Sequence, residues 1–175
     1  MVPIAAAVQA APPSNAIASS VARWNSLRQS DTLPFASYAS FLHGHQGWPG
    51  EAAMRRTAES RIDPSSTSPA DVVRYFASFP ALTPTGHAHH AFALMASGRV
   101  DQAREAARAA WTGGVLPAPV EQRLLGAFGG ALTPLDHDRR MDALLADGNT
   151  QSAYRALAWV SPARRPLYEA RLALQ

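Results

Sequence analysis

Histidines supply the first side chains that could do chemistry in this chain. There are six of them: His43, His45, His87, His89, His90 and His137. On a helix, His87 and His90 share one face, and they could hold a metal ion there if a third ligand came from elsewhere. No carboxylate stands at helical spacing to complete that set, and His89 points away from it. Because His87 recurs as His137, a packing or capping role is favoured, and we predict neither a metal site nor a cofactor site.

Charged side chains of both signs follow one another in one short segment: Asp136, Asp138, Arg139, Arg140 and Asp142. Asp136 and Arg140 have the spacing of a helical ion pair, which contributes only a few tenths of a kcal/mol when exposed. We therefore expect solvated or inter-helix ion pairs here. The glycine pairs at 113–114 and 129–130 lack the lysine and the preceding strand of a phosphate-binding loop, so we interpret them as helix ends.

The segment that must position these residues is a repeat. Leu82-Thr83-Pro84 with His87 matches Leu132-Thr133-Pro134 with His137 at an offset of 50 residues, and the match continues without a gap through Gly98 and Gly148. A fixed period of this size is typical of stacked supersecondary units.

Each copy predicts a helix, a tight turn and a return helix. Thr83 can cap the first helix and Pro84 can take its first position, while Gly98 can adopt the positive φ that ends it. The predicted apolar faces are Ala88, Ala91, Phe92, Met95, Val100, Ala103, Ala107, Ala110 and Trp111 in the first copy, and His137, Met141, Leu144, Leu145, Ala153, Ala156, Leu157 and Val160 in the second.

The rest of the chain predicts more helices and no strand. Apolar periodicity and caps indicate helices over 21–28, 34–43, 49–62, 68–79, 117–128 and 161–175. In the last of these, Leu167, Ala170 and Leu174 are predicted to form the buried face. We therefore expect an all-α fold of about nine helices, an α-solenoid or superhelix of antiparallel helix pairs over residues 18–175.

The composition excludes several classes of protein. Of the 175 residues, 47% are hydrophobic and 17% are charged, which is typical of a globular chain. All 16 basic residues are arginines, and they are spread among acids, which argues against a nucleic-acid partner. Without cysteine there is no disulfide or thiolate metal site. No apolar run reaches the roughly 18 residues that a membrane span needs.

The two ends of the sequence carry expectations of their own. Residues 1–17 are interpreted either as the remnant of a truncated signal peptide, because Ile4 to Ala11 is similar to the end of its apolar region, or as a flexible N-terminal tail. The last helix runs to Gln175 without a stop signal. This predicts that the natural chain continues and that the helical domain is incomplete at its C-terminal end.

Several motifs together resemble one known family. They are Trp24, Trp48-Pro49, Phe79-x-x-Leu82-Thr83, Gly98-Arg99, Ala110-Trp111 with Glu121, Leu132-Thr133-Pro134-x-Asp136-His137-x-x-Arg140-x-Asp142-x-Leu144-Leu145, and Arg165-x-Leu167-x-x-Ala170-Arg171-x-Ala173-Leu174-Gln175. The chain thus resembles the N-terminal superhelical, U-shaped domain of soluble lytic murein transglycosylases. The resemblance implies a periplasmic, exported protein whose lysozyme-like C-terminal domain cleaves peptidoglycan between N-acetylmuramic acid and N-acetylglucosamine, leaving a 1,6-anhydromuramic end through one catalytic Glu.

Glu59-Ser60 is similar to the Glu-Ser pair of that family's active site. However, Glu59 is predicted on the polar side of an early helix, and the glycine and aromatic motifs that should follow are missing. We treat the match as a coincidence and assign no catalytic residue. The sequence thus favours a scaffold portion of such an enzyme, inactive alone and reaching glycan strands through the catalytic domain. The alternative is a stand-alone helical-repeat protein-interaction module similar to tetratricopeptide proteins, with cell-wall proteins as possible partners.

Overall fold

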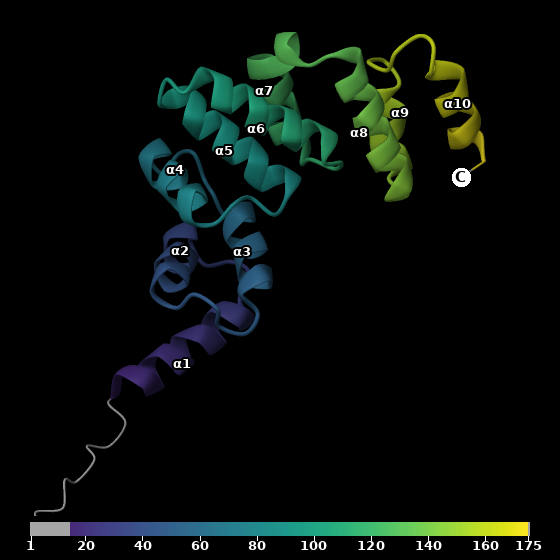
Figure 1. The fold of residues 1–175 in the computed structure, drawn as a ribbon. Helices are drawn as coiled ribbons and strands as arrows, with labels where there is room; N and C mark the ends of the chain where they lie inside the picture. Colours follow the sequence, from purple (N-terminus) through teal and green to yellow (C-terminus); the bar gives the residue numbers. More distant parts are fainter. Residues whose placement is uncertain (1–14, 175) are drawn as a thin grey trace, which may run out of the picture.

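The computed structural model describes residues 15–174, and every regular element in that range is a helix (Figure 1). The elements are α1 (Asn15–Gln29), α2 (Phe35–Gly44), α3 (Glu51–Ser60), α4 (Pro69–Ser78), α5 (Pro84–Ala96), α6 (Val100–Thr112), α7 (Ala118–Phe128), the short 3-10 helix η1 (Gly129–Ala131), α8 (Pro134–Ala146), α9 (Thr150–Ala156) and α10 (Arg165–Ala173). The predicted all-α fold is confirmed. The possible signal-peptide segment from Ile4 to Ala11 lies outside the described residues.

The two copies of the repeat begin in the same way. The Thr83 hydroxyl accepts a hydrogen bond from the Gly86 amide at 2.9 Å, and the Thr133 hydroxyl accepts one from the Asp136 amide at 3.3 Å. The proline after each threonine is the first residue of α5 and of α8. Each hydroxyl satisfies one of the four amides that a helix start leaves without a partner, so the start of both helices is fixed locally.

The two copies also turn in the same way. Gly98 has φ of 74° and Gly148 has φ of 66°, a conformation that costs a residue with a side chain about 1 kcal/mol or more. The amide after each glycine donates to the carbonyl five residues before it, at 2.9 Å in both copies. The return helices differ in length, since α6 has 13 residues and α9 has 7.

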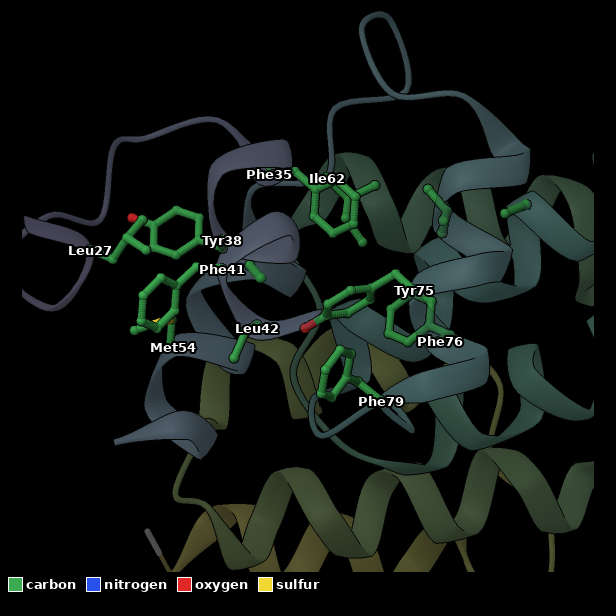
Figure 2. Close-up of a cluster of buried hydrophobic side chains, with 13 residues drawn as sticks. Leu27, Phe35, Tyr38, Phe41, Leu42, Met54, Ile62, Tyr75, Phe76 and Phe79 are labelled. Carbon is green, nitrogen blue, oxygen red and sulfur yellow. The ribbon is translucent and has the colours of Figure 1, made fainter. Parts of the chain in front are cut away.

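Buried apolar side chains form three clusters along the chain. The first lies among α2, α3 and α4 and is rich in aromatic rings, including Phe35, Tyr38, Phe41, Tyr75 and Phe79 (Figure 2). The second lies among α5, α6 and α7 and is built largely of alanines around a buried tryptophan. The third joins α8, α9 and α10. Each cluster draws on helices that are close in sequence, as expected for stacked helix pairs.

The helix packing follows the order of the chain. α5 packs closely against α6 and also touches α4 and α3, while α6 touches α8 and α8 touches α9 and α10. In Figure 1 the chain climbs from α1 through α2, α3 and α4 and then bends over into a row formed by α5, α6, α8 and α9. The result is a curved stack of helices.

One predicted apolar face is wrong. The residues predicted for the buried face of the last helix point to solvent: on α10 Leu167 is 52% exposed and Ala170 is exposed as well, and Leu174, just after α10, is 89% exposed. Tyr168 and Leu172 are buried instead. The rotation follows from the Tyr168 hydroxyl, which reaches α8 and donates there to the Asp138 carbonyl oxygen at 3.1 Å.

Smaller differences affect other predicted faces. Val100 is 37% exposed, and Phe92 and Met95 are only partly buried. The other residues of the two predicted repeat faces lie in or against the clusters, except His137, which is half-buried against Trp111 and Trp159. Within residues 15–174 no helix is both long and apolar enough to cross a membrane.

Candidate functional site

Glu59, which resembles half of an active-site motif, is fully buried at the end of α3. Its Oε1 accepts the Leu82 amide at 2.8 Å. Its Oε2 accepts the Thr83 amide at 2.8 Å and the Thr83 hydroxyl at 2.6 Å. The predicted position on the polar side of the helix is therefore wrong. Sequence periodicity could not reveal this burial, because the partners are backbone groups 23 and 24 residues further along the chain.

The surroundings of Glu59 leave no room for a substrate. A β-carbon built on Gly86 would lie 2.3 Å from Glu59 Oε2, so the backbone of α5 closes directly over the carboxylate. A general acid needs its proton within hydrogen-bond reach of the substrate. Both oxygens of Glu59 are instead used to hold the start of α5 against α3, which makes this residue a structural anchor.

Arg140 on α8 is the most deeply buried cation of the chain's described part, with 1% of its surface exposed. Its guanidinium donates to the carbonyl oxygens of Trp111 at 3.2 Å and Gly114 at 2.6 Å, and to Glu121 Oε2 at 2.9 Å. It also stacks over the Trp111 ring, with 4.1 Å between Cζ and the ring centroid. Burial lowers the pKa of Arg140 and Glu121 raises it, and a guanidinium stays protonated at neutral pH.

His137 lies between two tryptophans beside this arginine. Trp111 Nε1 donates to His137 Nδ1 at 3.1 Å, and the two rings meet edge to face. On the other side the Trp159 ring stacks on the imidazole, with 5.8 Å between ring centroids and 21° between planes. The packing role predicted for His137 is confirmed. Burial lowers its pKa, which favours the unprotonated Nδ1 that the Trp111 bond requires.

Two more buried carboxylates bind chain segments that lead into helices. Asp136 Oδ2 accepts the Thr133 amide and hydroxyl, both at 2.8 Å, and pairs with Arg108 of α6 at 3.3 Å. Burial raises the pKa of Asp136, but the Thr133 bonds and the Arg108 charge outweigh it, so the pKa is lowered overall. Asp138 accepts the Ser161 amide at 2.9 Å and its hydroxyl at 2.7 Å.

The ion pairs of this segment are inter-helix ones, which is one of the two arrangements expected. Asp136 pairs with Arg108 and Arg140 with Glu121, so the i, i+4 pair between Asp136 and Arg140 does not form. Asp142 pairs with Arg164 at 3.3 Å and with Arg171 at 3.0 Å, and Arg139 is exposed. These contacts tie α8 to α6, α7 and α10.

The histidines of α5 do not form a metal centre. His87 and His90 border one shallow hollow at the surface where α5 and α6 meet, whereas His89 lies on another side of α5 beside Phe92 and Arg123. In the range 15–174 no three side chains of the metal-binding types come together. His90 instead packs on Phe76, with 4.8 Å between ring centroids.

The other histidine pair also has packing partners. His43 Nδ1 lies 2.8 Å from the Ala39 carbonyl oxygen, and the ring contacts Phe79 edge to face. His45 bridges the Phe41 carbonyl and the Ser20 hydroxyl. A hollow of about 460 Å³ lies beside His43. The charged side chains in its wall, Asp71 and Arg74, pair with each other at 2.9 Å and are half-exposed or more.

Four of the residues that carry the family resemblance meet in one place. Trp111, Glu121, His137 and Arg140 form a joint between the first helical hairpin and the second, which we call the Arg140 joint. The glycine pairs are helix ends, as predicted, since Gly113 follows α6 and Gly129 follows α7. Sequence reasoning missed Glu59 and Asp138 as anchors. The only local signal for these anchors is the Thr-Pro or Ser-Pro dipeptide before a helix, because each carboxylate binds the hydroxyl and the amide of that Thr or Ser.

What the arrangement can do chemically is bind and orient backbone groups, because its charged atoms are paired inside the protein. No family model, no curated protein and no solved structure matches this chain.

Proposed function

We propose that this chain is the scaffold portion of a periplasmic soluble lytic murein transglycosylase. In this proposal the superhelix gives shape and a curved surface to a larger protein, and the cleavage of peptidoglycan glycan strands takes place in a lysozyme-like domain outside this sequence. The chain alone turns over no substrate.

The observation that carries the proposal is the Arg140 joint. His137 and Arg140, both from the Leu132–Leu145 block that carries the most specific part of the family resemblance, fix one helical hairpin against the next. Motif residues that fix one hairpin against the next are expected in a scaffold whose function depends on its shape. The anchoring of Glu59 by three hydrogen bonds supports the same conclusion, because the one residue that resembles a catalytic acid is committed to holding α5.

Two measurements test this proposal. The nucleotide sequence after codon 175 should stay in frame and encode a lysozyme-like domain that contains a Glu-Ser pair. The purified 175-residue chain, incubated with peptidoglycan sacculi, should release no 1,6-anhydromuropeptides detectable by mass spectrometry. Release of such products by the purified chain would show that the chain itself is the enzyme.

A second candidate is a stand-alone helical-repeat module that binds a protein. The hollow of about 330 Å³ beside His87 and His90 favours it, since stacked helix pairs commonly bind partners along such surfaces. A stop codon directly after Gln175 would favour this candidate over the first.

A further inference from the structure

The repeat lets one surface of the molecule be compared with itself. In the first copy, His87 and His90 of α5 and Ala109 of α6 line the hollow of about 330 Å³. Fifty residues later the same positions hold His137, Arg140 and Trp159. His87, His90 and Ala109 surround open space, whereas in the second copy the Trp159 ring lies against His137.

In the second copy an aromatic side chain packs on the histidine that corresponds to His87. The Trp159 indole stacks on the face of His137, while the Trp111 indole donates its N–H to the Nδ1 atom. Arg140 stacks on the same Trp111 ring and binds Glu121. The His137 imidazole thus has an aromatic partner on its face and a donor at its edge.

In the first copy His87 has neither of these partners, while His90 packs on Phe76. Ala109, at the position of Trp159, ends at a methyl group, and its side chain borders the hollow. Within residues 15–174, the ring nitrogens of His87 and His90 make no hydrogen bond to the protein. Burial lowers the pKa of both imidazoles, to about 4 for His90. At neutral pH each ring is uncharged and keeps one nitrogen free to accept a hydrogen bond.

We propose that this hollow binds a tryptophan side chain of a partner polypeptide, with the indole stacked on His87 and its N–H donated to an imidazole nitrogen. The hollow reaches the lower end of the roughly 300 to 1,000 Å³ range of ligand sites. Tryptophan is a common anchor of protein interfaces because its ring is apolar and it carries one donor.

A polypeptide is favoured as the source of the ring for two reasons. The ring that packs on His137 in the second copy comes from a turn of the chain just after α9, so the geometry suits an indole attached to a backbone. The open rim also carries Arg99 and Glu105, charges of opposite sign that can contact the polar groups of a bound peptide. The interaction does not require that the chain belong to a transglycosylase.

The chain supplies its own probe for a test. The capped peptide Leu-Ala-Trp-Val, the sequence of residues 157–160, is titrated into the full 175-residue protein while the imidazole Cε1–H resonances are followed by NMR. We expect saturable upfield shifts at His87 and His90, with a dissociation constant on the order of millimolar. The peptide Leu-Ala-Ala-Val should cause none.

Variants of Ala109 locate the site. Ala109→Trp should fill the hollow from within and weaken peptide binding by at least about tenfold. Ala52→Trp places the same ring on an exposed position of α3 and should leave binding unchanged. If Ala109→Trp does not fold, as judged by circular dichroism, Ala109→Phe replaces it.

Three outcomes would overturn the proposal. One is the absence of saturable shifts for the Trp peptide, and another is unchanged binding by a folded Ala109→Trp or Ala109→Phe variant. The third is equal affinity for N-acetyltryptophanamide, which would assign the hollow to a small aromatic ligand in place of a polypeptide.

Discussion

At the scale of single residues, the buried charges of this protein act on the backbone of neighbouring segments. Glu59 accepts an amide and a hydroxyl at the start of α5, and Asp138 accepts the same two groups in the turn before α10. Arg140 donates to two carbonyl oxygens at and just after the end of α6. Hydrogen bonds to charged groups stabilise a fold by about 1.5–3 kcal/mol each. Removing one partner should therefore destabilise the fold strongly, because the other is left buried and unpaired.

Glu59→Gln should lower the free energy of unfolding by about 1–3 kcal/mol. The amide nitrogen of Gln can only donate, so it would face an amide or hydroxyl that also needs an acceptor. Urea denaturation followed by circular dichroism measures the loss. Glu169→Gln is the matched control, since Glu169 is half-exposed and forms a surface pair with Arg165, and it should change stability by less than about 0.5 kcal/mol. Equal effects of the two substitutions would contradict the anchoring role.

Arg140→Ala should cost about 3–5 kcal/mol, because Glu121 and two carbonyl groups lose their donor. Arg140→Lys should recover only part of this, since an ammonium cannot reach all three acceptors while stacking on Trp111. The neighbour Arg139 is exposed, so Arg139→Ala should stay within about 0.5 kcal/mol of the wild type. Thermal and urea unfolding of the three variants provide the comparison.

At the scale of elements, the sequence predicts helix ends best where the signals are local. The first helix and the turn of each copy were predictable because Thr-Pro starts and glycine stops act within a few residues. The face of α10 was not predictable in the same way. Leu167 and Leu172 are equally apolar, so their side chains do not decide which face is buried. The hydroxyl of Tyr168 finds partners on α8, and that tertiary contact sets the rotation of the helix.

The corrected face of α10 gives a direct test. Leu172→Ala should destabilise the protein by about 2 kcal/mol or more, because Leu172 is 4% exposed within the third cluster. Leu167→Ala makes the same chemical change on the same helix at a residue that is 52% exposed, and should cost less than about 0.5 kcal/mol. Chemical denaturation of the pair measures the difference. A larger loss of stability for Leu167→Ala than for Leu172→Ala would support the face first predicted from the sequence, with Leu167 buried.

At the scale of the whole molecule, what the sequence could not predict is how the helix pairs are joined. The first two clusters follow largely from apolar spacing, whereas the third also depends on the contact of Tyr168 with α8. The Arg140 joint depends on residues of α6, α7 and α8 that meet only after folding. Local patterns determine each hairpin, and buried polar contacts between distant residues determine how one hairpin sits on the next.

Buried histidines should make the folded stack sensitive to acid. Burial lowers the pKa of His89 and of His90 to about 4, and Arg123 and the neighbouring His87 add to the respective shifts. The unfolded chain takes up protons near pH 6.5, so the stability that these neutral rings contribute is complete above that pH and is lost as the pH falls toward 4.

We expect the free energy of unfolding to drop by on the order of 1 kcal/mol per pH unit for each ring between pH 6 and pH 4. Urea denaturation at several pH values measures this slope. His89→Gln should make it shallower, while Arg139→Ala should leave it unchanged. An unchanged slope in His89→Gln would show that His89 does not titrate in this range.

The Arg140 joint also determines how the molecule would respond to a mechanical load. Neighbouring hairpins are linked there by a guanidinium lying on an indole and by a few directional bonds, whereas each hairpin is held internally by a continuous apolar cluster. Directional bonds break over short displacements, so a pull on the two ends would strain this link first. The frame would therefore flex like a hinge under tension while its hairpins keep their shape.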